Sequence, residues 1–312
     1  MKSVAVLIPC YNEETSIATV ISDFRKALPK ATVYVYDNNS TDKTREVARV
    51  AGAVVRTEPL QGKGHVVRRM FADVEADVYV LVDGDATYDA GAARDMVGLL
   101  VGESLDMVNG ARTADEAHVY RPGHRFGNWL MTHMVAWIFG NRFSDILSGY
   151  KVFSRRFVKS FPALAAGFET ETELVVHALE LRMPTAEIMT PYKDRLEGSQ
   201  SKLCTVKDGL RILWAILVLI KEERPMPFFS LLALVFAVVA SALLVPIVVQ
   251  FMDTGLVPRL PTAMMSMGLM IVAFFSLTCG LILDTVTRGR REMKRMRYLN
   301  IPALQSSEND PL

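Results

Sequence analysis

The stretch Val80-Leu81-Val82-Asp83-Gly84-Asp85 decides how the rest of this sequence is interpreted. A short apolar run ends abruptly in two carboxylates, Asp83 and Asp85, that are one residue apart. Such a run predicts a buried strand, and open α/β sheets bind ligands at the carboxyl ends of their strands. Because neighbouring carboxylates repel each other, we expect a cation beside them. A hard divalent ion, Mn²⁺ or Mg²⁺, would join these carboxylates to the phosphates of a substrate.

Three strand and helix units precede this stretch, and they favour a metal site over a solvated turn. Each unit is an apolar strand, a polar or glycine turn and a segment with helical periodicity. The predicted units are residues 4–9 with 16–28, residues 32–36 with 45–50, and residues 53–55 with 65–74. Alternation of this kind predicts an α/β fold whose mainly parallel sheet has helices on both faces.

Polar side chains stand at the ends of the predicted strands. They are Glu13, Asp37, Lys63, Asp83 and Asp85. In a doubly wound sheet these strand ends converge on one crevice. Carboxylates, a lysine and glycine amides together suit a nucleotide diphosphate with its metal ion.

Five segments resemble a known family. Pro9-Cys10-Tyr11-Asn12-Glu13-Glu14, Asp37-Asn38-Asn39-Ser40-Thr41-Asp42 and Asp83-Gly84-Asp85 resemble the signature of family 2 glycosyltransferases with the GT-A fold. Asp145-Ile146-Leu147-Ser148-Gly149-Tyr150 and Arg195-Leu196-Glu197-Gly198-Ser199-Gln200-Ser201-Lys202 resemble the branch of dolichol-phosphate mannosyltransferases and bacterial polyprenyl-phosphate glycosyltransferases. The resemblance implies a GT-A, Rossmann-like mixed sheet that is mainly parallel and flanked by helices.

The resemblance, which covers about residues 3 to 225, implies roles for individual residues. The donor contacts that it implies are Pro9, Tyr11, Asn12, Glu13, Asp37, Asn38, Lys63, Asp83, Gly84 and Asp85. The acceptor phosphate contacts that it implies are Arg125, Ser148, Arg195, Ser201 and Lys202. Asp83 and Asp85 would hold the metal, and with Arg195 and Lys202 they form the expected catalytic set.

The chain departs from the family pattern at three positions. Asn38 stands where a second carboxylate is often found, and Thr87 stands where some relatives have a metal-coordinating Gln. Ile146 replaces the usual Pro after Asp145. These changes bear on base selectivity and metal coordination, so the base, UDP or GDP, and the sugar, a hexose or an N-acetylhexosamine, stay open.

The chemistry favours a phosphate acceptor. A sugar hydroxyl needs a positioned base, whereas a phosphate monoester, with a second pKa near ~6, is already ionised at neutral pH. The metal, Lys63, Arg195 and Lys202 would neutralise the two anions that must meet. We therefore expect inverting displacement at the anomeric carbon, through an oxocarbenium-like state, with undecaprenyl or dolichyl phosphate as the acceptor.

Two long apolar stretches without charge, residues 228–251 and 263–283, predict membrane-spanning helices. The alternative interpretation is that both stretches are buried core helices of a soluble domain. Lys221 and Arg224 precede the first stretch, and several basic residues between 288 and 297 follow the second. By the positive-inside rule, the catalytic domain lies on the cytoplasmic face of the inner or plasma membrane.

The expected organisation has four parts: a catalytic domain, residues 1–203; an interfacial amphipathic helix, 204–225; the two spans, 226–284; and a basic, partly disordered cytoplasmic tail, 285–312. By its pattern alone, the segment at 126–139 fits a core helix and an interfacial helix equally, and the family resemblance favours the interfacial one. The formal net charge of +1 gives no indication of a nucleic-acid partner. The resemblance implies a homo-oligomer, and a tetramer is one form of it.

Two other functions stay open. One is a membrane glycosyltransferase with a hydroxyl acceptor, and the other is a non-catalytic scaffold that binds nucleotide. An acidic segment, residues 169–173, begins a predicted helix. The helix dipole favours carboxylates at this end of a helix. Because the resemblance places this segment near the sugar, Glu169 or Glu171 has two interpretations, a helix cap or a donor contact.

Overall fold

The computed structural model describes residues 2–113, 133, 135, 140, 142–164, 167, 169–193, 218 and 221–304. The chain divides into two compact units. The first contains residues 1–212 together with 293–312, and the second contains residues 213–292.

The first unit is built on a sheet of seven strands in the order β3-β2-β1-β4-β6-β5-β7. The strands are β1 Val4–Cys10, β2 Thr32–Asp37, β3 Val54–Thr57, β4 Val78–Leu81, β5 Met107–Arg112, β6 Lys151–Ser154 and β7 Thr185–Thr190. β6 runs antiparallel to both β4 and β5, and the other pairs are parallel. The predicted mixed, mainly parallel sheet is confirmed.

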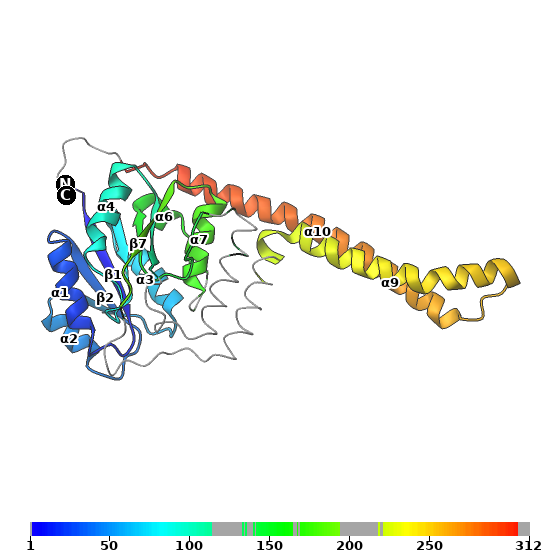
Figure 1. The fold of residues 1–312 in the computed structure, drawn as a ribbon, viewed down its shortest axis with the longest axis horizontal. Helices are drawn as coiled ribbons and strands as arrows, with labels where there is room; N and C mark the ends of the chain where they lie inside the picture. The colour runs from blue at the N-terminus through cyan, green and yellow to red at the C-terminus, as the bar shows by residue number, and fades with distance from the viewer. Residues whose placement is uncertain are drawn as a thin grey trace. The chain divides into compact units, whose positions relative to one another are not determined.

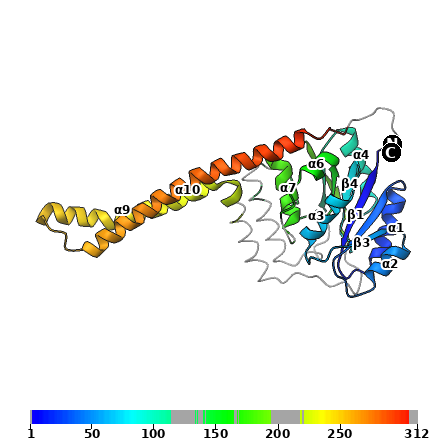
Figure 2. The same ribbon diagram turned by 180° about the vertical axis from the view of Figure 1, so that it is seen from behind.

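Helices cover both faces of this sheet (Figures 1 and 2). They are α1 Ile17–Ala27, α2 Thr44–Val50, α3 Lys63–Asp73, α4 Ala92–Gly102, α6 Arg155–Ser160 and α7 Thr170–Glu180. α1, α2 and α4 lie on one face, whereas α3, α6 and α7 lie on the other. Strands that are covered on both faces read as continuous apolar runs, which explains why β1 and β4 are recognisable in the sequence.

The core joins the helices to the loops at the carboxyl edge of the sheet. α1 buries Ile17, Val20, Ile21 and Phe24, which are spaced to share one face of the helix. The Phe24 ring packs edge to face on Tyr150, with 5.9 Å between the ring centroids. Tyr150 is fully buried at the start of β6, so the core supports the loop that precedes this strand.

α3 begins two residues earlier than the periodicity predicts. Gly62 has a φ of 137°, which residues with a side chain rarely adopt, so the chain turns at this residue. Lys63 is therefore the first residue of the helix rather than part of a glycine turn. Its position next to the carboxyl ends of β1 and β4 follows from this turn.

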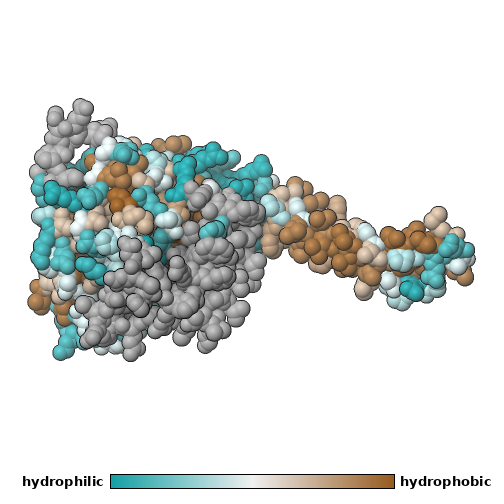
Figure 3. Space-filling model, in the orientation of Figure 1, coloured by the Kyte–Doolittle hydropathy of each residue, from teal (hydrophilic) through white to brown (hydrophobic). Residues whose placement is uncertain are grey.

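The second unit contains α9, Pro225–Thr254, and most of α10, Leu260–Leu299. Both helices are long and apolar enough to cross a membrane, and only 17% and 22% of their most apolar windows are buried. A core helix of a soluble domain would be mostly buried. Figure 3 shows an apolar surface along these helices, which indicates membrane association. Both predicted spans lie within them.

Small residues bring α9 and α10 close together. The Ser266 hydroxyl of α10 donates to the Ala240 carbonyl oxygen at 2.8 Å. A Cβ at Gly280 would lie 2.9 Å from the Phe229 Cβ, so only glycine fits there without a shift. Small residues of this kind let membrane helices approach closely.

The last turns of α10 belong to the first unit. Lys294 Nζ donates to Glu180 Oε2 at 2.7 Å, and the Tyr298 hydroxyl donates to Asp106 Oδ2 at 2.7 Å. The Arg156 guanidinium lies 4.7 Å from the centre of the Tyr298 ring. Part of the region expected to be a basic tail is thus helical and packed, while residues 305–312 lie outside the described residues.

Candidate active site

The loops that follow β1 and β2 are tied to each other. Asn12 Oδ1 accepts from the Thr41 backbone N–H at 2.8 Å, and the Asn12 N–H donates to Ser40 Oγ at 2.9 Å. The Glu13 N–H donates to Thr44 Oγ1 at 2.8 Å. Asn12 has a φ of 54°, a left-handed conformation that asparagine tolerates better than most residues. These contacts give Asn12 a structural role beside the expected donor site.

Asp37 is the last residue of β2, and its two carboxylate oxygens differ in their hydrogen bonding within the described part of the chain. Its side chain is fully buried, and Oδ2 accepts from the Ser40 N–H at 3.2 Å and faces Arg45 Nε at 3.5 Å. Oδ1 is buried and has no hydrogen-bond partner within the described part of the chain. A buried carboxylate oxygen without a donor is costly, so this atom is suited to accept an N–H from a ligand.

Asn38 holds the segment that leads into Lys63. Its Nδ2 donates to the carbonyl oxygens of Glu58 and Leu60, at 2.9 and 2.7 Å. Its Oδ1 accepts from the Gly62 N–H at 2.7 Å. Three of the four hydrogen bonds that an amide can make are therefore used inside the protein.

Lys63 joins two carboxylates from distant parts of the chain. Its Nζ forms ion pairs with Asp83 Oδ1 and with Glu171 Oε1. The side chains of Lys63 and Glu171 are only 11% and 7% exposed, whereas that of Asp83 is 29% exposed. Burial opposes the charged amine, but the two carboxylates outweigh it and raise the pKa of Lys63. Burial also raises the pKa of Glu171, and Lys63 offsets only part of that effect.

Asp85 is anchored by the residues that follow it. Thr87 donates to Asp85 Oδ1 from its hydroxyl at 2.6 Å and from its backbone N–H at 3.3 Å. Ala86 between them has a φ of 60°, which is strained for a residue with a Cβ. The tight turn fixes the orientation of the Asp85 carboxylate. Thr87, which replaces the Gln of some relatives, therefore supports a carboxylate by hydrogen bonding.

Two glycines allow close approaches at the Asp83-Gly84-Asp85 segment. A Cβ on Gly84 would lie 2.7 Å from the Cys10 sulfur, and the Gly84 carbonyl accepts from the Ser16 hydroxyl at 2.7 Å. A Cβ on Gly149 would collide with the Asp83 carboxylate. Gly149 thus brings the loop before β6 against the predicted metal ligand.

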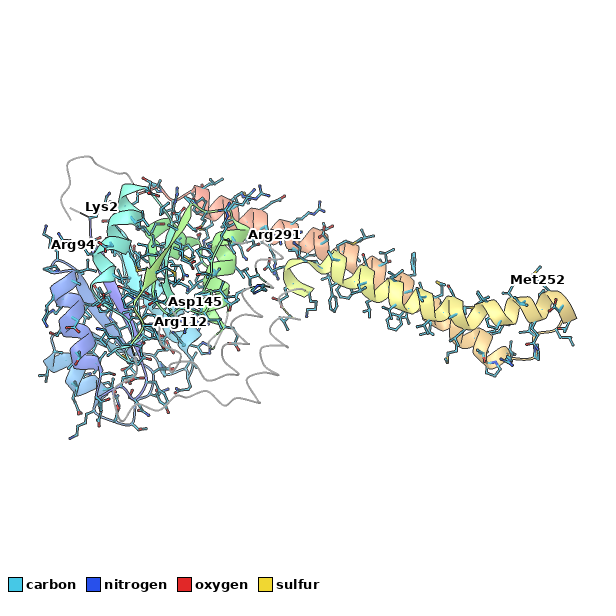
Figure 4. The ribbon with its side chains drawn as sticks, viewed as in Figure 1. Lys2, Arg94, Arg112, Asp145, Met252 and Arg291 are labelled. Atoms are coloured by element: carbon cyan, nitrogen blue, oxygen red, sulfur yellow. The ribbon has the colours of Figure 1, made fainter. Side chains whose placement is uncertain are left out.

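Asp145 is bound by Arg112 at the carboxyl end of β5 (Figure 4). Arg112 Nε and Nη2 donate to the two Asp145 oxygens at 2.6 and 2.8 Å. Burial would raise the pKa of Asp145, but these hydrogen bonds and the Arg112 charge lower it. A carboxylate that is held in this way is a weak base.

Lys151, to which no motif in the sequence points, holds the same loop. It is fully buried, and its Nζ donates to Asn109 Oδ1 at 2.7 Å and to the Ser148 carbonyl oxygen at 2.6 Å. Burial lowers its pKa to about 8, although Asp145 and Glu171 act in the opposite direction. The signal in the sequence that could have identified Lys151 is the presence of a lysine within an apolar strand pattern.

The structure brings all of the predicted donor residues to one edge of the sheet. The residues found there are Pro9, Tyr11, Asn12, Glu13, Asp37, Asn38, Lys63, Asp83, Gly84 and Asp85. Ser148 is buried, and its hydroxyl donates to the Gly110 carbonyl oxygen at 2.5 Å, so it holds the loop. Arg125, Arg195, Ser201 and Lys202 lie outside the described residues, as does most of the segments at 126–139 and 204–225.

Solved structures of low sequence identity share this fold. Glucosyl-3-phosphoglycerate synthase from Mycobacterium tuberculosis, in complex with Mn²⁺, uridine diphosphate and phosphoglyceric acid, aligns with a TM-score of 0.57. The alignment covers 69% of this chain and 78% of that one, at 22% identity. This likeness confirms the GT-A fold that the sequence led us to expect.

Two curated relatives are similar over most of the sequence. Glycosyltransferase AglJ from Haloferax volcanii is 33% identical over 304 residues, which are 95% of this chain and 98% of the relative. The dolichyl-phosphate hexose transferase of the same organism is 26% identical over 220 residues, 70% of this chain and 95% of the relative. A glycosyl transferase family 2 profile matches residues 5–160. The chain therefore belongs to glycosyl transferase family 2.

Proposed function

We propose that this enzyme transfers one hexose or N-acetylhexosamine, with inversion, from a UDP- or GDP-sugar to undecaprenyl or dolichyl phosphate. The observation that carries the proposal is the gathering of Asp37, Lys63, Asp83 and Asp85 at the carboxyl edge of the sheet. The name of one relative, dolichyl-phosphate hexose transferase, supports the acceptor class.

The nucleobase would bind at Asp37. Its buried Oδ1, which has no hydrogen-bond partner among the described residues, can accept a ring N–H, which both uracil and guanine possess. Burial of this oxygen makes the match selective, because a base without a donor would leave Oδ1 without a hydrogen bond.

Asp83 and Asp85 would bind Mn²⁺ or Mg²⁺ together with the diphosphate. Their fit rests on two observations: the half-buried Asp83 carboxylate already has a cation, the Lys63 ammonium, and Asp85 is held by Thr87. Among the described residues, no three His, Cys, Asp or Glu side chains are grouped to hold a metal ion. Diphosphate oxygens would complete the coordination, as is common for these ions. When bound, the ion neutralises charge on the leaving diphosphate.

The acceptor would be a phosphate because the site holds Asp145 as an ion pair. With both oxygens engaged by Arg112 and its pKa lowered, Asp145 is unsuited to remove a proton from a hydroxyl. An ionised phosphate oxygen needs no base. This oxygen would attack the anomeric carbon while the bond from that carbon to the diphosphate oxygen breaks. Arg195 and Lys202 are proposed, on the sequence pattern alone, to bind the acceptor phosphate.

The acceptor chain would stay in the bilayer. α9 and α10 are the apolar helices that would anchor the enzyme there. We propose that the catalytic unit faces the cytoplasm, since basic residues flank both helices on the side away from their short connection. Nucleotide sugars are available in that compartment.

The proposal is tested by transfer from radiolabelled UDP- and GDP-sugars to polyprenyl phosphate, using the detergent-purified enzyme with and without Mn²⁺. One donor should give label that partitions into organic solvent, is released by mild acid and is lost with EDTA. Asp85→Ala should abolish transfer, whereas Asp95→Ala, an exposed aspartate on α4, should not.

Other outcomes would replace the proposal. Acid-stable label on a hydroxyl acceptor would identify a glycosyltransferase of the other class. Metal-dependent nucleotide binding without transfer to any acceptor would identify a binding scaffold. Full transfer by Asp85→Ala would remove that carboxylate from the metal site.

A further inference from the structure

The ion pairs of Lys63 place a protein cation where the metal is expected. The ammonium contacts Asp83, the more exposed of the carboxylates involved, and is itself almost buried. Asp83 is also the residue against which Gly149 packs, so its carboxylate has little freedom to move aside. The ammonium and a divalent ion would therefore compete for the same carboxylate.

Glu171 provides a second ion-pair partner for Lys63. It lies in the first turn of α7, and its Oε1 already contacts the Lys63 ammonium. Its Oε2 is buried and without a hydrogen-bond partner among the described residues. Lys63 can thus leave Asp83 and keep a counter-ion, without its charge entering an apolar environment unpaired.

The charges explain why this exchange would require the nucleotide. Before any ligand binds, Lys63 balances one of the two carboxylates it touches. A metal ion alone would add two positive charges beside the ammonium, and the cations would repel each other. A diphosphate that arrives with the ion supplies the missing negative charge, so both cations can remain.

We propose that Lys63 holds Asp83 in the absence of donor, and that Glu171 retains Lys63 when the metal and the diphosphate bind. This exchange makes metal binding dependent on nucleotide. Glu171 acts in it as a positioning residue, through Lys63. The inference deepens the function proposed above and rests on its metal site, but not on the identity of the donor, the sugar or the acceptor.

The first test is the affinity of the free enzyme for Mn²⁺, measured without nucleotide by electron paramagnetic resonance. Lys63→Met, which keeps an unbranched side chain of nearly the same length without the charge, should bind Mn²⁺ more tightly than the wild type, by about tenfold. Glu171→Gln should bind it more weakly, by a similar factor, because Lys63 then has only Asp83 as a partner. Weaker binding by Lys63→Met, or unchanged binding by both variants, would overturn the proposal.

A double variant separates the exchange from general electrostatics. If Glu171 acts through Lys63, Glu171→Gln should have almost no effect on Mn²⁺ affinity in the Lys63→Met background. An effect that persists at full size in that background would mean that Glu171 acts on the ion directly, which would also overturn the proposal. Circular dichroism of each variant establishes that it is folded.

Matched controls use the same substitutions at the opposite edge of the sheet. Lys26→Met lies in the last turn of α1, and Glu103→Gln follows the end of α4. Both are exposed, and neither should alter Mn²⁺ affinity. Sugar transfer is measured separately: shifted Mn²⁺ affinities without transfer would support the exchange and refute the proposed function, whereas transfer with unshifted affinities would do the reverse.

Discussion

At the scale of single residues, the Asp83 carboxylate has room for its position because Gly149 has no side chain. A methyl group on Gly149 would displace the Asp83 carboxylate, whereas the glycine backbone itself has no left-handed φ to preserve. We expect Gly149→Ala to remain folded and to lose transfer activity by at least ~100-fold, because small displacements at a reacting centre are costly. Steady-state transfer kinetics and thermal unfolding of the same preparation check this.

A matched substitution identifies what causes that loss. Gly102→Ala, where a Cβ would meet no atom within 4 Å, should leave activity and stability close to those of the wild type. Normal activity of Gly149→Ala would show that Asp83 tolerates another position.

Asn38 offers a second prediction at this scale, because the family pattern that the sequence resembles often has a carboxylate at this position. Asn38→Asp would set an oxygen against the carbonyl oxygens of Glu58 and Leu60, which lose their donor. Each unsatisfied buried group costs about 1–3 kcal/mol. We expect a melting temperature several degrees lower and faster hydrogen exchange at Gln61 to Gly64.

The neighbouring residue is the control for that prediction. Asn39 Nδ2 also donates to a carbonyl oxygen of this segment, that of Pro59 at 2.8 Å, but Asn39 is exposed. Water can replace this hydrogen bond, so Asn39→Asp should change the melting temperature much less. Equal effects at the two positions would mean that burial of Asn38 is not the cause.

At the scale of elements, α7 links the active site to the end of α10. Glu171 lies in the first turn of the helix beside Lys63, and Glu180 ends the helix beside Lys294. His177 lies between them, and its ring packs edge to face against the rings of Phe157 and Phe161. Burial lowers the pKa of His177 to about 3, and the charge of Lys294 adds to this effect.

This shift predicts how stability depends on pH. Because the folded pKa of His177 is below its unfolded value of ~6.5, the unfolded state binds a proton first, and stability falls as pH decreases below 6.5. In His177→Leu this loss should be absent, so the difference in stability should shift toward the variant by up to about 1.4 kcal/mol per pH unit. Unfolding measured between pH 7 and 4 tests this, and parallel curves for the two proteins would contradict it.

At the scale of the whole molecule, the apolar surfaces of α9 and α10 indicate membrane association (Figure 3). The protein should therefore stay in the membrane after an alkaline carbonate wash and be released by detergent. Release by carbonate alone would mean that the two helices are attached to the membrane surface.

The proposed orientation makes a separate prediction. A reporter enzyme that is active only outside the cytoplasm should be active when fused after Gly255, in the connection between α9 and α10. The same reporter fused after Ile301 should be inactive. The reverse pattern would place the catalytic unit outside the cytoplasm.

By itself, the sequence determined the type and order of most elements, because apolar periodicity reports burial and period directly. The runs in β1, β2 and β4 and the polar residues that end them predicted a sheet with an acidic edge. The uncharged length of the two apolar stretches predicted α9 and α10. The roles at the acidic edge came from the family resemblance, and all of them stay predictions. Arg125, Arg195, Ser201 and Lys202 lie outside the described residues.

Only the tertiary structure decided which side chains meet. The ion pairs of Lys63 with Glu171 and of Arg112 with Asp145 join segments that are far apart in the sequence. They depend on the antiparallel insertion of β6 between β4 and β5 and on the placement of α7 beside α3. No local period encodes such contacts, because they follow from strand order and packing, and these arise only when the whole core is assembled.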